Sequence, residues 1–190
     1  MKAFIVSGGR NPKGQTARAA EALLEGLRGA GAAGEIVHLP PLAIERCRQC
    51  DDDGWGLCRR EGRCVIEDDL AGLVDRLRAA DVVAFATPVY FSDLAESLRA
   101  MLDRLRRTCM HEAGKRGLAG KPAVGLCVAG GGGGGAPACT VSLERVLATC
   151  GFDVVDMVPA RRQNLETKLD VLRATGRHLA AQPAKPTAAH

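Results

Sequence analysis

Residues 3–28 read AFIVSGGRNPKGQTARAAEALLEGLR, and their pattern points to one class of fold. The first four residues are apolar and precede a glycine-rich loop, which is typical of a buried strand. From Gln15 to Arg28, alanine and leucine recur at helical spacing, and Gly29 follows where such a helix should end. A buried strand, a loop and a helix begin a parallel βαβ unit, so this segment predicts an α/β fold.

The alternation of strand and helix continues along the chain. We expect further strands at 35–39, 82–86, 123–128 and 154–158, and further helices at 68–80, 94–107, 140–150 and 165–181. Helices between successive strands require right-handed crossovers. The pattern therefore predicts a three-layer, doubly wound domain with a five-stranded parallel sheet in the order 2-1-3-4-5. We expect a single domain over residues 1–181 with a cysteine-rich loop insertion at 44–67, followed by a disordered tail at 182–190.

Composition excludes several classes of protein. The formal charge of +4 is spread along the chain and only 3% of the 190 residues are aromatic, which argues against a nucleic-acid interface. The longest uncharged run, 122–143, contains six consecutive glycines and Pro137, so it cannot be one membrane helix. The apolar stretch before Arg10 is too short for a secretory signal. We therefore expect a cytoplasmic protein with no membrane partner, whose eight cysteines form no disulfide framework.

The loop after the first strand suits a phosphate. Ligands of parallel sheets bind at the carboxyl ends of the strands. Here Ser7 and Thr16 offer hydroxyls, Arg10 can pair with a dianion, and the following helix presents free N–H groups. The spacing is that of neither a triphosphate P-loop nor a dinucleotide-binding loop. The alternative is a plain strand-to-helix turn that needs glycine and a capping threonine.

Two further segments follow strands at the same edge of the predicted sheet. Residues 86–92 combine Pro88 with Tyr90 and Phe91, and could hold a flat ring beside the phosphate; the alternative is a hydrophobic cap on the sheet. The glycine run 130–135 would let the backbone approach a ligand closely, and the alternative is a low-complexity linker.

The loop at 44–67 has no periodicity and holds four cysteines in the spacing C-x2-C-x7-C-x5-C. Four thiolates at such spacing can bind zinc or an iron–sulfur cluster, and the third alternative is a set of free thiols. The three aspartates 51–53 within the loop would disfavour an anionic cluster beside them. Cysteines elsewhere are expected to be buried core residues: Cys109, Cys127, Cys139 and Cys150.

Three blocks together resemble the flavodoxin-like NADPH-dependent FMN reductase family, and in particular its branch of iron–sulfur flavoproteins. Residues 7–16 are similar to the family's S-x-R-x-x-G-x-T loop, and residues 58–69 to its C-x-x-x-G-x-C-x-x-x-D-D segment. Residues 87–104 are similar to its S-P-V-Y-F … K-x-x-x-D-R segment. The chain departs from the family where Gln15 replaces the usual asparagine and Arg99 a common lysine.

The resemblance implies an FMN-dependent oxidoreductase. NAD(P)H would reduce bound FMN, which would then reduce a small acceptor (a quinone, flavin, azo or nitro compound, or metal ion) by a ping-pong route. The chemistry would belong to the flavin, with no catalytic side chain. The alternatives are an iron–sulfur flavoprotein or flavodoxin-type electron-transfer protein, and a specialised biosynthetic flavoenzyme. Family members are typically homodimers or homotetramers, which we expect here too.

The resemblance also implies ligand sets. FMN would be bound by Ser7, Arg10, Gly14, Gln15, Thr16, Pro88, Val89, Tyr90, Phe91, Gly130, Gly131, Gly132 and Gly133. A [4Fe–4S] cluster would be bound by Cys47, Cys50, Cys58 and Cys64.

Overall fold

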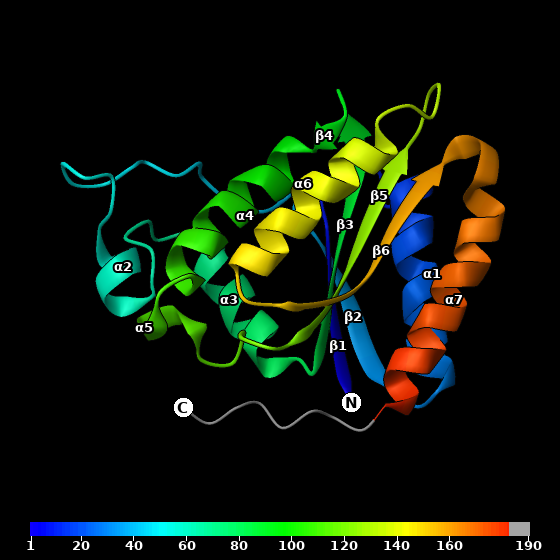
Figure 1. The fold of residues 1–190 in the computed structure, drawn as a ribbon, viewed down its shortest axis with the longest axis horizontal. Coiled ribbons are helices and arrows are strands. Elements are labelled where there is room, and N and C mark those ends of the chain that lie inside the picture. Colours follow the sequence, from blue (N-terminus) through cyan, green and yellow to red (C-terminus); the bar gives the residue numbers. More distant parts are fainter. Residues whose placement is uncertain (183–190) are drawn as a thin grey trace.

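A parallel β-sheet runs through the middle of the computed structural model, which describes residues 1–182 (Figure 1). Its strands are β1 (Lys2–Ser7), β2 (Ala33–His38), β3 (Val82–Tyr90), β5 (Pro122–Ala129) and β6 (Asp153–Arg161). Their order is β2-β1-β3-β5-β6, which confirms the predicted order of the five parallel strands. A two-stranded antiparallel pairing of β4 (Asp93–Leu94) with the end of β3 was not predicted.

Helices cover both faces of this sheet. The longer ones are α1 (Gln15–Gly29), α3 (Leu70–Ala79), α4 (Glu96–Cys109), α6 (Ala136–Thr149) and α7 (Leu165–Ala181). The short ones are α2 (Leu57–Glu61), α5 (Glu112–Lys115) and the 3-10 turn η1 (Arg162–Asn164). Figure 1 shows α1 and α7 on one face and α3, α4 and α6 on the other. The predicted three-layer arrangement is confirmed.

The central strands β1, β3 and β5 are almost wholly apolar because both of their faces are buried. In β1, Phe4 and Val6 pack toward the core under α3, α4 and α6, whereas Ala3 and Ile5 pack toward α1 and α7. All four side chains are almost fully buried. This is why the first strand reads as an unbroken apolar run rather than as an alternating one.

Two glycines bring α1 and α7 into close contact. A Cβ atom at Gly26 would lie 2.2 Å from the carbonyl oxygen of Arg173, and one at Gly176 would lie 2.4 Å from that of Leu23. Any larger residue at either position would push the two helices apart. The helix that follows the first loop is therefore fixed against α7 by backbone contact.

The structure corrects three predicted boundaries. Residues 87–90, expected in a loop, continue β3, because Thr87 and Pro88 stay in register with β5 and Val89 pairs with Leu94 of β4. Helix α6 begins at Ala136 rather than at residue 140, with Pro137 in its first turn, where its missing N–H costs nothing. The predicted loop at 44–67 contains the short helix α2, which the sequence did not indicate.

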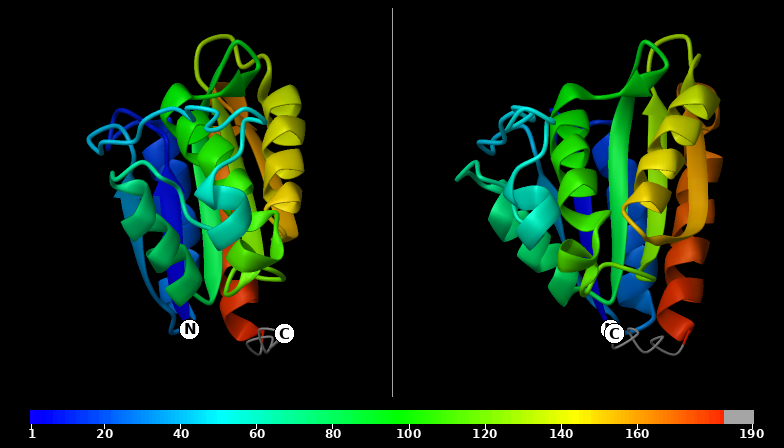
Figure 2. Two further views of the ribbon diagram at one scale, coloured as in Figure 1. Left: turned by 90° about the vertical axis from the view of Figure 1, so that its left-hand side faces the viewer. Right: turned by 60° about the vertical axis from the view of Figure 1, so that its left-hand side comes forward.

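The insertion at 44–67, named the cysteine loop below, lies outside the α3–α4 layer. In Figure 2, left, where the left-hand side of Figure 1 faces the viewer, this cyan segment crosses in front of the molecule. Of the predicted tail, residues 183–190 lie outside the described part of the chain, so its disorder stays a prediction. In residues 1–182, no helix combines the length and the apolar character needed to cross a membrane.

Candidate functional site

A cleft opens at the carboxyl ends of β1, β3 and β5, where a doubly wound sheet places its ligands. Its cavity volume is about 440 Å³. Three segments far apart in the sequence form it: the β1–α1 loop, the end of β3, and the end of β5 with the first glycines after it. Its lining residues are Gly9, Arg10, Asn11, Gly14, Gln15, Thr16, Pro88, Val89, Tyr90, Val128, Gly130 and Gly131.

One end of the cleft is suited to an anion. Helix α1 begins there, and no side chain caps its N-terminus at Gly14, so its first N–H groups stay free for a ligand. Arg10 is the one charged residue among the described residues that line the cleft. The side-chain carbonyl of Gln15 is buried and has no hydrogen-bond partner within residues 1–182. An unpartnered buried amide at an uncapped helix end is what a missing polar ligand would leave.

The other end of the cleft is apolar and flat. Pro88 and Val89 are half-buried at the end of β3, Val128 is buried at the end of β5, and Tyr90 is 44% exposed at the rim. The glycines that follow β5 add backbone without side chains: at Gly130 and Gly131 a Cβ atom would meet no other atom within 4 Å. An aromatic ring system can lie against such a wall.

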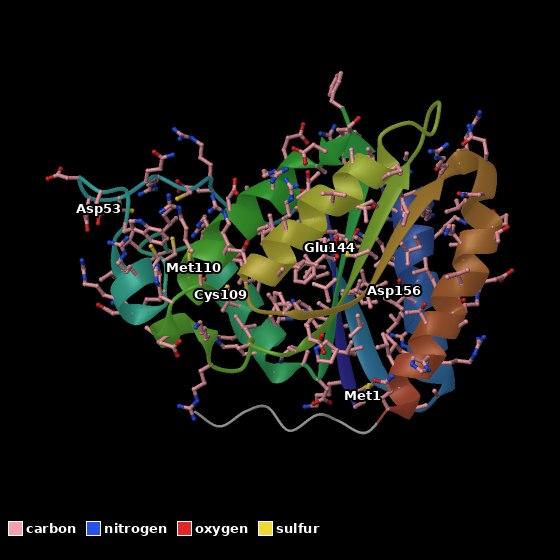
Figure 3. All side chains as sticks on the ribbon, in the orientation of Figure 1. Met1, Asp53, Cys109, Met110, Glu144 and Asp156 are labelled. Atoms are coloured by element: carbon pink, nitrogen blue, oxygen red, sulfur yellow. The ribbon has the colours of Figure 1, made fainter. Side chains whose placement is uncertain are left out.

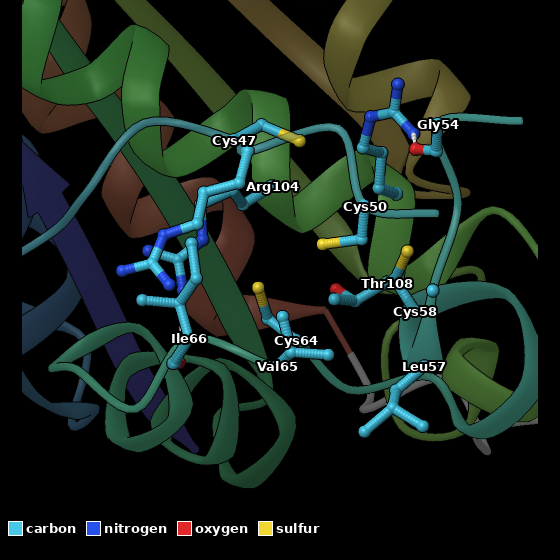
Figure 4. A pocket seen from close by; sticks show the side chains of 13 residues that line it. Cys47, Cys50, Gly54, Leu57, Cys58, Cys64, Val65, Ile66, Arg104 and Thr108 are labelled. Carbon is cyan, nitrogen blue, oxygen red and sulfur yellow. Dashed lines mark hydrogen bonds between the residues drawn. The ribbon is translucent and has the colours of Figure 1, made fainter. Parts of the chain in front are cut away.

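A second pocket, with a cavity volume of about 20 Å³, lies between the cysteine loop and α4, and it is called the thiol pocket below. Figure 4 shows Cys47, Cys50, Cys58 and Cys64 around it, with Arg104 and Ile66 near one side and α2 near the other. Three arginines also line it: Arg48, Arg104 and Arg107. Its described lining residues include no carboxylate, so every charged side chain that lines it is an arginine.

The four thiols surround this pocket without converging on one point. Within residues 1–182, no three side chains of cysteine, histidine, aspartate or glutamate lie close enough together to hold a metal ion as they stand. The donor chemistry nevertheless suits a thiolate-bound centre, since four sulfur atoms and three guanidinium groups share one cavity.

The aspartates at 51–53 do not line the thiol pocket. Figure 3 shows Asp53 at the outer tip of the cysteine loop, away from the sheet. Its carboxylate accepts a hydrogen bond of 2.9 Å from Arg59. The unfavourable charge that the sequence suggested beside a cluster is therefore turned outward and partly neutralised.

Comparison with known proteins decides the family. Residues 1–163 match the family described as NADPH-dependent FMN reductase. The chain belongs to this family. Among its curated relatives, an iron–sulfur flavoprotein of Methanocaldococcus jannaschii is 28% identical over 106 residues, which is 56% of this chain and 52% of the relative. The chain thus matches about half the length of that relative.

Solved structures place this FMN reductase family member in the flavodoxin-like fold. An NAD(P)H:quinone oxidoreductase from Methanothermobacter marburgensis superposes with a TM-score of 0.69 at 24% identity, over 96% of this chain and 98% of its own. A flavodoxin from the domain Archaea gives a TM-score of 0.60 at 14% identity, over 95% and 99% of the two chains. At these identities the likeness concerns the fold alone.

The structure brings most of the residues predicted to bind flavin into one cleft. Four of them lie outside its lining: Ser7, Phe91, Gly132 and Gly133. Ser7 is fully buried, and its hydroxyl accepts a hydrogen bond of 3.3 Å from the Gly9 N–H. It therefore stabilises the conformation of the loop. Phe91 is fully exposed in a turn with φ of 49°, outside the cleft. Their contact with a flavin stays a prediction.

Sequence reasoning missed three residues that line the cleft: Gly9, Asn11 and Val128. The first two lie in the loop already singled out. The third ends β5 just before the glycine run, and only the strand order shows that it faces the same cleft.

The four cysteines outside the loop are core residues, as expected. Cys127 contacts Cys139, and Cys109 contacts Cys150, and all four are almost fully buried. The hydrogen bond to Cys139, together with burial, raises the pKa of the Cys127 thiol, and the contact with Cys109 and burial raise the pKa of Cys150. Such thiols stay neutral and act as small apolar side chains in this family member.

Proposed function

We propose that the protein is an NAD(P)H-dependent oxidoreductase that binds FMN in the cleft and passes its electrons to a small acceptor. One observation carries the proposal. The uncapped N-terminus of α1 and Arg10 lie at one end of a cleft whose other end is an apolar wall. A phosphate and a flat ring at the two ends of one molecule match this arrangement.

The residues of the cleft would bind and orient the cofactor. The α1 N-terminus and Arg10 would hold the phosphate, and the side chains of Gln15 and Thr16 would supply further polar contacts. Pro88, Val89 and Tyr90 would exclude water from one edge of the ring. When bound, FMN supplies hydride acceptance from NAD(P)H and onward delivery of electrons. No protein acid or base would be needed, because the flavin itself would carry the hydride and electron transfer.

A single cleft also favours alternating substrates. NAD(P)H and the acceptor would approach the same open face, so one must leave before the other enters, as a ping-pong route requires. We propose a homodimer or homotetramer as the working form, and the cytoplasm as its compartment, since eight free cysteines suit a reducing environment.

Anaerobic purification and titration with FMN test this proposal. We expect bound or titratable flavin, NAD(P)H oxidation that depends on FMN, and parallel double-reciprocal plots when the acceptor concentration is varied. Intersecting plots would remove the ping-pong route while leaving the flavin site. A protein that neither carries nor binds FMN would remove the proposal.

A second candidate function concerns the thiol pocket, because all four loop cysteines line it beside three arginines. We propose that it holds a thiolate-bound centre. The curated relatives are named iron–sulfur flavoproteins, which makes a [4Fe–4S] cluster the first candidate and zinc the second. A cluster would make the protein an electron-transfer component in addition.

Metal analysis of the anaerobically purified protein separates these cases. A cluster predicts about four iron atoms per chain together with a broad visible absorption, and zinc predicts about one metal ion without colour. The double variant C47S/C64S should lose the metal, whereas C109A, which alters a cysteine outside the loop, should keep it. If the anaerobically purified protein contains no metal, the four cysteines are free thiols. This result would contradict the second proposal.

A further inference from the structure

Arg104 is a charged side chain in the core of the molecule. It lies on α4 between Leu102 and Leu105, and its side chain is only 1% exposed. An apolar residue would be expected at such a position, because removing a guanidinium from water is costly unless its hydrogen bonds are satisfied. The contacts of Arg104 should therefore show which groups its charge stabilises.

The guanidinium of Arg104 forms hydrogen bonds with residues at both ends of the cysteine loop. It forms a two-pronged ion pair with Asp68, with N–O distances of 2.5 and 3.0 Å. It also donates to the carbonyl oxygen of Glu45 at 3.1 Å and to that of Ile66 at 3.3 Å. Glu45 precedes the first loop cysteine and Ile66 follows the last, so one side chain holds both ends of the segment.

Asp68 completes this closure. Its side chain is 6% exposed, and its carboxylate also accepts hydrogen bonds from the backbone N–H groups of Glu45, at 2.9 Å, and Leu70, at 3.2 Å. Burial alone would raise the pKa of Asp68, but these hydrogen bonds and Arg104 hold it below its usual value. The carboxylate and both terminal nitrogens of the guanidinium thus have partners, and the Nε of Arg104 has none within residues 1–182.

Arg104 also forms part of the thiol pocket. Its guanidinium lines the same cavity as the Cys64 thiol. One helical turn further on, Arg107 donates to the carbonyl oxygen of Gly54 at 2.8 Å, and its guanidinium lies 4.5 Å from the centre of the Trp55 ring. Helix α4 therefore holds the base of the loop through Arg104 and its tip through Arg107.

We infer that Arg104 is a positioning residue for the thiol pocket: through Asp68 and the loop backbone it holds Cys47 and Cys64 at one cavity, and it presents positive charge to their sulfur atoms. The inference rests on the proposed function only in taking the four thiols as one site. It does not depend on which metal that site holds. The two-pronged pairing explains why the position requires arginine rather than lysine.

Trp55 provides the readout, because it is the one tryptophan of the chain and sits at the loop tip. The variants are R104Q, R104K and the double variant D68N/R104Q, which leaves no unpaired buried charge. The matched control is R106Q, since Arg106 lies on the same helix but pairs with Asp103 near the surface. Circular dichroism reports whether the sheet and helices remain, while Trp55 emission and the reaction of loop thiols with a disulfide reagent report the loop.

We expect R104Q and the double variant to keep the fold, to shift Trp55 emission to longer wavelength, and to expose the loop thiols. Their reaction rate should rise about tenfold or more, because losing several buried charged hydrogen bonds changes a local opening equilibrium by at least that factor. R104K should lie between these variants and the wild type. R106Q should match the wild type.

A spectroscopic measurement tests the effect on the pocket itself. When Co²⁺ is added anaerobically to the metal-free wild type, the protein should show thiolate-to-cobalt absorption. The absorption should be weaker in R104Q, and in R104K it should lie between that of R104Q and that of the wild type. Wild type that shows no such absorption counts against the proposed metal centre, while the Trp55 and thiol measurements still decide the role of Arg104. Folded R104Q or double variant with unchanged emission and thiol rates would overturn the inference. Loss of the whole fold in every Arg104 variant would also overturn it, since the residue would then serve the core rather than the loop.

Discussion

The cleft and the thiol pocket are built in opposite ways. The cleft lies on the ends of three parallel strands, and its walls are largely backbone and small side chains held by the sheet. The thiol pocket lies on a long loop outside the sheet and is held mainly by two arginines of α4. In the cleft, a side chain can change its ligand contacts without disturbing the fold. In the pocket, we expect Arg104 to decide whether the loop cysteines stay together at one cavity.

The sharpest test of this contrast is D68A. It leaves Arg104 buried without its partner, which typically costs about 3–5 kcal/mol. We expect a loss of that size in the free energy of unfolding, measured with urea. D75A is the matched control, because Asp75 is an exposed residue of α3 that pairs with Arg78, and it should change stability by less than about 0.5 kcal/mol. A D68A variant as stable as D75A would contradict the structural role given to the pair.

In the cleft, R10A should weaken FMN binding and leave the stability of the fold unchanged, which is the reverse of the effect expected for D68A. Losing a charge-assisted contact to a phosphate should weaken FMN binding about 10- to 100-fold. The unfolding transition of the flavin-free protein should not move, because Arg10 is exposed and holds no other element. Flavin fluorescence titration measures the affinity. K13A is the control in the same loop, since Lys13 lies outside the cleft lining, and equal effects of the two variants would argue against Arg10 as a phosphate ligand.

Acid should affect the pocket before the cleft. The pKa of Asp68 is lower in the folded protein than in the unfolded chain, so its charge stabilises the fold above the unfolded pKa of about 3.9. That stabilisation is lost as the pH falls through the lower, folded pKa. We expect Trp55 emission to shift in this acid range, with a smaller loss of stability than in D68A. D68N should lack the transition, and its persistence there would assign the transition to another group.

The smallest effect is expected at the loop tip. The guanidinium groups of Arg59 and Arg107 lie 4.7 and 4.5 Å from the centre of the Trp55 ring. Each such contact contributes about 0.5–1 kcal/mol at a partly exposed site. W55L should therefore lower the free energy of unfolding by about 1–2 kcal/mol and leave FMN affinity unchanged. Weaker FMN binding in W55L would show that the two regions are coupled.

The same contrast separates what the sequence could predict from what it could not. Apolar strands and amphipathic helices are local patterns, so residues 3–28 already indicated the fold and placed the first loop of the cleft. The extension of β3 through Pro88 depends on pairing with β5 and β4, which no local pattern signals. From sequence alone, Asp68 is only the first residue of a predicted helix at 68–80. Its main partner, Arg104, lies 36 residues later, and only the folded chain brings the two together.

The close contact of Gly26 with Gly176 has a consequence for the order in which the protein is made. As the chain emerges from the ribosome, α1 appears early, but the helix that covers its apolar face comes about 140 residues later. At usual rates of synthesis this leaves α1 uncovered for several seconds or more. The close packing of α1 against α7 can therefore form only late in synthesis, after the other strands and helices have emerged.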